Sequence, residues 1–209
     1  MYQDILAKLK HHTPIEIGKH HTYAVLLPII TIDGKDQILY EVRSQLVSQP
    51  GEVSFPGGAV EAGESLEAAA VRETCEELRL DPDKIKVLGK LGSLVNARAT
   101  IHCYVGYLEI KSLEDLDPNE EVDRLFTLSI DQLKGHQPYY HRLQQEISLG
   151  SDFPYDRVPH GQSYQFKQDS RKVPFYLDLE ENLWGLTANF TDAFMQMMTA
   201  EDQGRKDPK

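Results

Sequence analysis

The chain has 209 residues, of which 26% are charged and 40% hydrophobic, and its formal net charge is −11. A chain this acidic repels polyanions, which argues against nonspecific binding to nucleic acid or to an anionic membrane surface. It holds no apolar run of about eighteen residues, the length that a membrane helix needs, and no apolar stretch of the signal-peptide kind near its start. Cys75 and Cys103 show no pairing framework, so we expect a cytoplasmic protein with reduced thiols.

In chain order, the first expected elements are a short helix and a β-hairpin. Residues 2–11 are predicted to be helical, and residues 23–32, rich in β-branched side chains, to form a strand. Asp33 and Gly34 follow this strand and are typical of a two-residue hairpin turn. Residues 37–43 are therefore expected to pair with it as the second strand.

A longer helix is expected from Leu66 to about Leu78, where neither glycine nor proline intervenes. Ser65 can cap its N-terminus, because a serine hydroxyl accepts a hydrogen bond from an unpaired amide of the first turn. At about 100° per residue, the helix has two distinct faces. The apolar face, which we expect to pack inward, comprises Ala68, Val71, Cys75 and Leu78. The opposite face carries Glu73, Glu76 and Glu77.

The three glutamates on this helix suggest a metal site, although their spacing alone does not establish one. Carboxylates grouped in this way suit a hard cation such as Mg²⁺ or Mn²⁺, whereas a solvated acidic helix face is the commoner explanation. Two nearby features favour the metal site. Gly57 and Gly58 allow the backbone to approach a ligand closely. Arg72 offers a fixed fork of donors that can hold Glu64 or Glu76 in position.

The second half of the chain is expected to continue with strands and to end in a helix. Three strands and a helical turn are predicted, over residues 87–95, 101–109 and 122–129 and from Ile130 onward. Residues 135–174 have weak periodicity, so we expect an irregular insertion that covers the substrate or forms part of a homodimer contact. A last helix is predicted over residues 187–200, before a frayed tail. No repeat or linker is evident, so residues 1–209 are expected to form one domain.

The segment from Gly58 to Leu80 resembles the Nudix box, the sequence motif of the Nudix hydrolases. That motif places a glycine, a glutamate and the run Arg-Glu-x-x-Glu-Glu at fixed spacings before an aliphatic residue. The matching residues are Gly58, Glu64, Arg72, Glu73, Glu76, Glu77 and Leu80. Two positions depart from the motif: Thr74 replaces an aliphatic residue, and Arg79 replaces the glycine that usually ends the helix.

A second resemblance concerns the residues just before this motif. Residues 39–58 are similar to the segment that precedes the Nudix box in coenzyme A pyrophosphatases, with matches at Arg43, Ser44, Gly51, Phe55, Pro56, Gly57 and Gly58. Tyr40 and Glu41 replace a leucine and a threonine, and no second arginine stands where Ser48 lies. Residues 183–187, Leu-Trp-Gly-Leu-Thr, resemble the segment with which that subfamily opens its last helix.

These resemblances imply an α/β fold, the Nudix-type α/β/α sandwich with a mixed sheet, and a pyrophosphohydrolase that uses Mg²⁺ or Mn²⁺. The implied substrate is a small nucleotide, coenzyme A or a derivative, cut between its phosphates to 3′,5′-ADP and 4′-phosphopantetheine. The implied metal ligands are Glu73, Glu77, Glu76 and the carbonyl of Gly58 or Gly57. The implied catalytic residues are Arg72 and a general base that is Glu76, Glu120 or Glu121. The implied substrate-binding residues are Arg43, Ser44, Phe55 and Gly57.

Other interpretations stay open at this point. The substrate could be another nucleoside diphosphate derivative, such as ADP-ribose or a dinucleotide, or the domain could sense nucleotides without hydrolysing them. The intact acidic residues of the motif and Arg72 favour an enzyme over a sensor. A solvated acidic loop also explains Glu120 and Glu121, and a surface or core-bridging role also explains Arg43.

Overall fold

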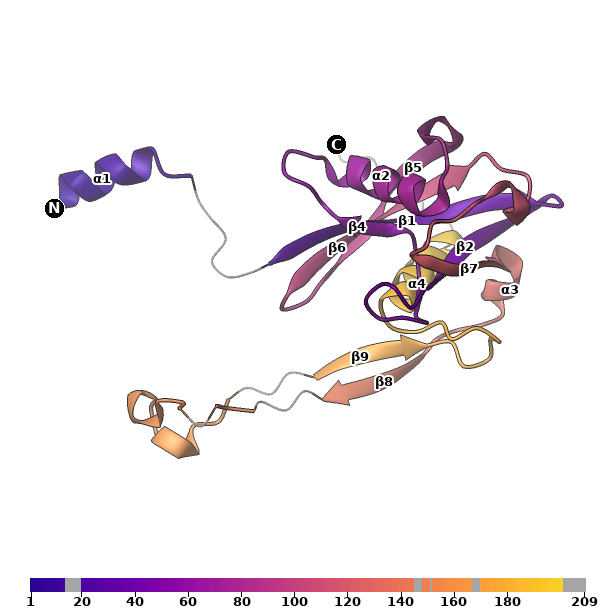
Figure 1. Cartoon of the computed structure of the whole chain (residues 1–209). Coiled ribbons are helices and arrows are strands. Elements are labelled where there is room, and N and C mark those ends of the chain that lie inside the picture. The colour runs from indigo at the N-terminus through magenta and orange to yellow at the C-terminus, as the bar shows by residue number, and fades with distance from the viewer. Residues whose placement is uncertain (14–19, 145–147, 151, 167–169, 201–209) are drawn as a thin grey trace, which may run out of the picture.

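The fold is organised around a strand that is buried on both of its faces. Strand β1 (His21–Ile32) has buried side chains from Ala24 to Ile30, as expected for a central strand of a sheet that is covered on both sides. The structure is a computed structural model that describes residues 1–13, 20–144, 148–150, 152–166 and 170–200. Figure 1 shows the sheet and the helices on either side of it.

Seven strands form the main sheet, in the order β3-β2-β1-β6-β5, with β4 beside β1 and β7 beside β2. Strand β1 pairs parallel with β6 (Ala99–Leu108) and antiparallel with β2 (Lys35–Arg43), so the sheet is mixed. The other strands are β3 (Val53–Ser54), β4 (Gly57–Ala59), β5 (Ile85–Val95) and β7 (Val122–Ser129). The predicted strands are all present with small shifts of their ends, namely those over 23–32, 37–43, 87–95, 101–109 and 122–129.

The hairpin between β1 and β2 turns at Asp33 and Gly34, as the sequence predicts. Both residues have positive φ angles, 52° and 74°, which is the conformation of a type I′ turn. Ile32 and Lys35 are paired on either side of it. Because this turn follows the twist of the strands, it sets the register that carries Glu41 to its place further along β2.

Helices α2 (Leu66–Leu78) and α4 (Gly185–Thr199) cover opposite faces of the main sheet (Figure 1). Alternate residues of β1 point to the two sides. Leu26 packs in the core that contains Leu78 of α2, whereas Leu27 packs in the core that contains Phe190 of α4. The expected α/β/α sandwich with a mixed sheet is therefore confirmed.

Helix α2 has the predicted bounds, but a different face of it packs inward. Ser65 caps the helix as expected and accepts a hydrogen bond from the Ala68 N–H at 3.1 Å. The buried residues of the helix are Ala69, Ala70, Thr74, Glu77 and Leu78. The predicted inward face is therefore wrong except at Leu78: the helix is turned by about one residue, roughly 100°. The reason is that Glu77 joins the buried side, where the backbone of β4 bonds to it.

Residues 135–174 are more regular than the sequence indicates. They contain most of a β-hairpin, formed by β8 (Tyr139–Gln144) and β9 (Ser170–Phe175). Phe175 stacks on Trp184 with ring centroids 5.4 Å apart, which attaches this hairpin to the start of α4. The expectation of an irregular insertion is wrong at both ends of this region, because the pairing joins residues that are far apart in the sequence.

The remaining described elements are short or lie at the N-terminus. Helix α1 (Tyr2–Lys10) matches the first predicted helix and has no buried residue. Helix α3 (Ile130–Lys134) is the predicted helical turn. The predicted frayed tail lies outside the described residues. Short 3-10 helices cover Pro82–Lys84, Leu113–Asp115, Tyr155–Arg157 and Gly161–Ser163. Within the described ranges, no helix is long and apolar enough to cross a membrane.

Candidate active site

The turn between β3 and β4 carries two glycines, and each occupies a position that a side chain would obstruct. Gly57 pairs with Val25 of β1, and a Cβ atom on it would lie 2.5 Å from the Ala24 carbonyl oxygen. A Cβ atom on Gly58 would lie 2.3 Å from the carboxyl group of Glu73. The Glu73 carboxylate therefore rests directly against the backbone of β4.

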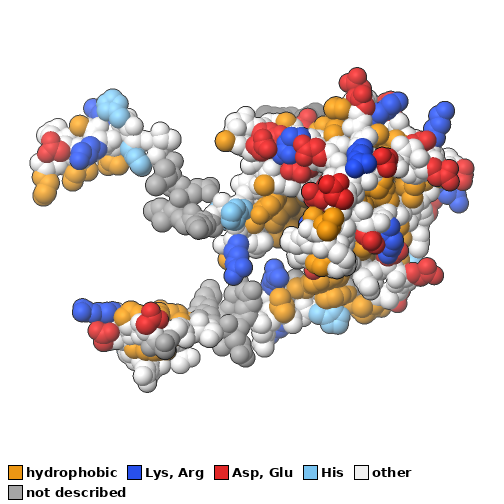
Figure 2. All heavy atoms as spheres, in the orientation of Figure 1, with side chains coloured by type: hydrophobic (Ala, Val, Ile, Leu, Met, Phe, Trp, Pro, Cys, Tyr) orange, Lys and Arg blue, Asp and Glu red, His pale blue; other side chains and the backbone are white. Residues whose placement is uncertain are grey.

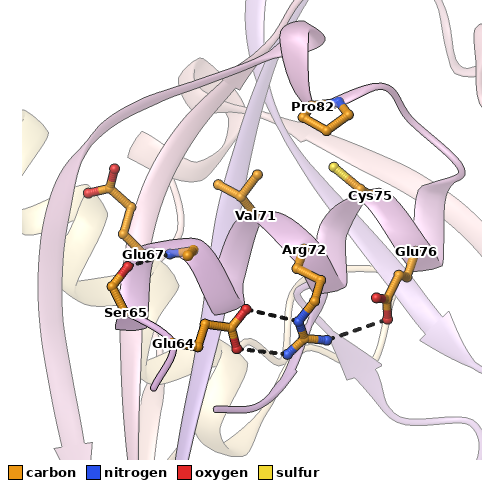
Figure 3. A pocket seen from close by; sticks show the side chains of 9 residues that line it. Glu64, Ser65, Glu67, Val71, Arg72, Cys75, Glu76 and Pro82 are labelled. Carbon is orange, nitrogen blue, oxygen red and sulfur yellow. Dashed lines mark hydrogen bonds and ion pairs between the residues drawn. The ribbon is translucent and has the colours of Figure 1, made fainter. Parts of the chain in front are cut away.

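Arg72 holds the neighbouring carboxylates in fixed positions. Its Nε and Nη2 atoms donate to the two carboxylate oxygens of Glu64, at 2.9 and 3.1 Å (Figure 3). Nη1 donates to Glu73 Oε1 at 2.9 Å, and Nη2 also donates to the Ala59 carbonyl of β4 at 3.1 Å. The bonds from Arg72 lower the pKa of Glu64. They also tie α2 to the strand that follows the glycine turn.

Glu77 lies one helical turn after Glu73 and is 5% exposed. Its Oε2 atom accepts a hydrogen bond from the Gly57 N–H at 2.9 Å. Burial raises the pKa of Glu77, and the charges of Glu41, Glu73 and Glu121 raise it further, against the opposing effect of the Gly57 amide. In the part of the chain that the structure describes, no positive charge compensates the charged form of Glu77.

Glu41 is a buried carboxylate that sequence reasoning missed as a site residue. It lies on β2, is 2% exposed, and accepts a hydrogen bond from the Ser54 hydroxyl on Oε1 at 2.8 Å. Its Oε2 atom has no hydrogen-bond partner among the described residues. Burial raises the pKa of Glu41, against the effects of Ser54 and Arg43. The period of two in β2 is the signal that could have found it, because the alternate residues pack under α4, namely Ile38, Tyr40 and Val42.

The loop before β7 brings two further glutamates beside the end of α2. Asn119 anchors it, because its backbone N–H donates to the Glu77 carbonyl at 2.8 Å. Ser44, at the end of β2, donates its N–H to the Glu121 carbonyl at 2.8 Å and its hydroxyl to the Glu120 carbonyl at 2.6 Å. The loop is therefore fixed to both α2 and β2.

Comparison with known proteins decides the family. A match to the NUDIX domain covers residues 20–147, which is more than half of the chain and includes all of the carboxylates described above. This chain belongs to the Nudix family.

Relatives along most of the chain agree with this assignment. Nudix hydrolase 3 of Caenorhabditis elegans is 33% identical over 171 residues, which cover 78% of this Nudix chain and 68% of that protein. The mitochondrial coenzyme A diphosphatase NUDT8 of Mus musculus is 33% identical over 182 residues, which cover 84% of this chain and 77% of that protein. The prediction of a Nudix hydrolase, an enzyme that acts on diphosphate bonds, is confirmed at the level of the family.

A solved structure supports the Nudix fold. A MutT/nudix family protein from Enterococcus faecalis aligns with a TM-score of 0.55 over 97% of this chain and 71% of that chain. The sequences are 13% identical, so this likeness concerns the fold alone.

The glutamates of the Nudix box lie in two different environments. Glu73 and Glu77 face the glycine turn, whereas the Glu76 side chain is 57% exposed and its Oε2 atom lies 3.5 Å from Arg72 Nη1 (Figure 3). The three carboxylates predicted as metal ligands therefore do not all converge. The additional carboxylate beside Glu77 comes from Glu41 on β2.

The donor set fits a hard divalent cation, although each of its carboxylates also accepts a hydrogen bond from a protein donor. In the described part of the chain, no three His, Cys, Asp or Glu side chains are grouped so as to hold a metal ion. Glu73 is held by Arg72, and Glu77 by the Gly57 N–H. Glu77 and Glu41 are nevertheless buried, and Glu41 Oε2 has no partner within the described residues. Burying a carboxylate is costly unless its charge and its hydrogen bonds are satisfied, and oxygen donors of this kind suit Mg²⁺ or Mn²⁺.

The three candidates for a general base differ in their partners. Glu76 faces Arg72 at 3.5 Å, and Glu120 Oε2 lies 3.7 Å from Arg79 Nη2. The charge of Glu121 raises the pKa of Glu73 and Glu77, and the charge of Glu76 also raises that of Glu73. Glu121 is therefore the candidate that has no ion pair with an arginine among the described residues.

The predicted substrate-binding residues have structural contacts of their own. Arg43 Nε donates to the Ser48 carbonyl at 2.8 Å and closes the loop after β2. Phe55 is 3% exposed and stacks on Tyr40 with ring centroids 5.2 Å apart. Its ring lies in the core under α4, so the expected contact of Phe55 with substrate is not supported. Ser44 bonds to the loop before β7, and a contact of Arg43 or Ser44 with substrate stays a prediction.

A groove of about 550 Å³ runs along the outward side of α2, from Glu64 to Pro82. Val71, Arg72 and Cys75 of α2 are among the residues that line it (Figure 3). Figure 2 shows acidic side chains, with basic ones between them, over this part of the surface. Neither Glu73 nor Glu77 lines the groove, so it is separate from the buried carboxylates.

Proposed function

We propose that this Nudix protein is a metal-dependent hydrolase of the diphosphate in coenzyme A or its derivatives. The observation that carries the reaction is the convergence of Glu73 and Glu77 on the backbone of Gly57 and Gly58, with Arg72 holding the first of the two carboxylates. Carboxylates fixed beside the backbone of two glycines offer hard oxygen ligands for a divalent cation.

Glu73 and Glu77 are the residues that would hold Mg²⁺ or Mn²⁺, and the Gly58 carbonyl is a further oxygen donor. Such a cation supplies charge neutralisation at the diphosphate and lowers the pKa of a bound water. Arg72 keeps the Glu73 carboxylate in one orientation, so that this carboxylate moves little when substrate binds. The net charge of −11 makes bound positive charge the more necessary for an anionic substrate.

Glu121 is the general base in this proposal. A general base must be free to accept a proton from the attacking water, and Glu76 and Glu120 each face an arginine. The water oxygen forms a bond to one phosphorus while the bond from that phosphorus to the bridging oxygen breaks. The proton of the water passes to Glu121, and the bridging oxygen leaves on the other phosphate. Coenzyme A would give 3′,5′-ADP and 4′-phosphopantetheine.

Two likenesses support coenzyme A as the substrate. Residues 39–58 resemble the segment that precedes the Nudix box in coenzyme A pyrophosphatases, and a relative that is 33% identical over 84% of the chain is named a coenzyme A diphosphatase. A cytoplasmic location stays a prediction, since relatives carry the names mitochondrial and peroxisomal. A homodimer also stays a prediction.

The proposal is tested with purified protein, coenzyme A and either Mg²⁺ or Mn²⁺, with both products identified by mass spectrometry. We expect hydrolysis that a chelator abolishes. Glu77→Gln keeps the acceptor for the Gly57 N–H but removes the charge, so kcat should fall at least about 100-fold. Glu109→Gln, at an exposed position just after β6, removes the same charge elsewhere and should leave kcat unchanged.

Other substrates separate the alternatives. If ADP-ribose or a dinucleotide is cleaved far faster and coenzyme A is inert, the substrate is wrong while the reaction class stands. If the protein binds these nucleotides and Mn²⁺ but hydrolyses none of them, it is a nucleotide sensor instead of an enzyme.

A further inference from the structure

One oxygen of a buried carboxylate on β2 has no protein partner. Glu41 is 2% exposed, and while its Oε1 atom accepts a hydrogen bond from Ser54, its Oε2 atom has none among the described residues. Buried polar atoms are nearly always hydrogen-bonded, so a single exception points to a missing partner or to a function. The hydrolytic roles assigned above give Glu41 no function, and they give its Oε2 atom no partner.

The charged groups around Glu41 come from three elements. Glu77 of α2 and Glu121 of the loop before β7 bring like charge, and Arg43 of β2 brings the opposite charge. The Arg43 guanidinium also bonds to the Ser48 carbonyl in the loop after β2. Three carboxylates therefore share this region with one arginine, and the unpartnered oxygen belongs to the most buried of them.

The backbone explains why Glu41 meets Glu77. Tyr40 and Val42 pack into the core under α4, so the side chain between them points to the opposite face of the sheet, which α2 covers. Glu77 lies in the last turn of that helix and is also buried. The two carboxylates thus approach each other from a strand and a helix that packs on it.

We propose that Glu41 binds the divalent cation together with Glu77, with its free Oε2 atom as a ligand from outside the Nudix box. This inference rests on the metal-dependent function proposed above and deepens it. The segment that residues 39–58 resemble has a threonine at this position, so Glu41 adds one negatively charged ligand to the site. An additional carboxylate strengthens the binding of a hard cation.

The experiment measures metal binding directly, without turnover. Mn²⁺ is titrated into the full chain and free Mn²⁺ is followed by electron paramagnetic resonance, while the unfolding midpoint is recorded with and without metal. The proteins are the wild type, Glu41→Gln, Glu41→Thr and the exposed control Glu109→Gln. We expect Glu41→Gln and Glu41→Thr to weaken Mn²⁺ binding at least about tenfold, with a smaller rise of the midpoint on adding metal.

A purely structural role for Glu41 predicts a different pattern. In that case the metal-free midpoint falls and Mn²⁺ affinity stays at the wild-type value, which would overturn the inference. We expect instead that the metal-free midpoint of Glu41→Gln is not lower than that of the wild type, because a buried carboxylate next to Glu77 has lost its charge. A wild-type protein that binds no Mn²⁺ overturns the proposed function itself, so the two failures are distinguishable.

Discussion

At the scale of single residues, Gly58 shows how little space the site leaves. A methyl group there would lie 2.3 Å from the Glu73 carboxyl group, which Arg72 holds in place. The added methyl group would clash with the Glu73 carboxyl group and not with a side chain of the hydrophobic core. We expect Gly58→Ala to displace Glu73 and to lower kcat/KM by about 100-fold. The unfolding midpoint should fall by only a few degrees, roughly 2–4 °C for each kcal/mol lost.

Gly92 provides the matched control for this substitution. Outside residues 91–93, no described atom lies within 4 Å of the position that a Cβ on Gly92 would take. Gly92→Ala should therefore leave both kcat/KM and the unfolding midpoint close to the wild-type values. If Gly58→Ala is fully active, the position of Glu73 in this structure is not the one that the reaction uses.

The sequence allows some of these residues to be predicted but not others. Arg72, Glu73 and Glu77 are predictable because their spacing on one helix is a property of consecutive residues. For Glu41, the period of two in β2 predicts only which face of the sheet its side chain takes, because its burial depends on α2 and β3, which come later in the chain. In the segment that residues 39–58 resemble, Glu41 is seen only as the residue that replaces a threonine.

At the scale of elements, the end of α2 depends on an unusual residue. Arg79 adopts a left-handed conformation, with φ 48° and ψ 44°, at the position where the Nudix motif has glycine. Its guanidinium lies 3.1 Å from Asp117 Oδ2 and 3.7 Å from Glu120 Oε2, so it links the helix end to the loop before β7. These ion pairs are exposed and contribute roughly 0–1 kcal/mol each.

Two variants separate the backbone cost from the ion pairs. Arg79→Gly and Arg79→Ala both lose the contacts with Asp117 and Glu120, but only alanine retains the steric cost of a left-handed residue, roughly 1–2 kcal/mol. The greater freedom of glycine in the unfolded chain offsets part of that difference. We expect Arg79→Gly to be more stable than Arg79→Ala by about 1 kcal/mol in urea unfolding. Equal stabilities would mean that the helix end relaxes to another conformation.

The bounds of α2 are predictable from the sequence, whereas its orientation on the sheet is not. Ser65 and the absence of glycine and proline fix where the helix lies. Its inward face depends on Glu77 bonding to Gly57, a contact that no helical pattern contains. Strand β4 is also not predictable from the sequence. Gly57–Ala59 has no apolar periodicity, and it forms a strand because β1 lies beside it.

At the scale of the whole molecule, the sheet separates two cores, and the buried glutamates lie on the face that α2 covers. The core under α2 includes Leu39 and Leu78, near the buried glutamates. The core under α4 includes Tyr40, whose hydroxyl lies 3.1 Å from the Thr191 hydroxyl. Strand β2 contributes to both cores, so it couples the position of Glu41 to the packing of α4.

The hairpin of β8 and β9 is attached to this body through its base. Phe175 stacks on Trp184, and Tyr140 donates a hydrogen bond to Asp192 of α4. Phe175→Ala removes the stacked ring and should lower the free energy of unfolding by about 2–3 kcal/mol. Chemical denaturation measures this loss. The loss found for Phe175→Ala is the value against which a deletion beyond the β8-β9 ladder is compared.

Residues 145–169, which join β8 to β9 in the sequence, should be dispensable for the stability of the sheet. Gln144 and Ser170 are paired across the ladder, so an Asn-Gly turn can join them in the existing register. Deleting residues 145–169 removes aromatic rings whose described ring contacts are with one another. These rings belong to Phe153, Tyr155, Tyr164 and Phe166. We expect the shortened protein to unfold within about 4 °C of the wild type and to bind Mn²⁺ with unchanged affinity. A loss as large as that of Phe175→Ala would show that residues 145–169 pack on the body of the molecule.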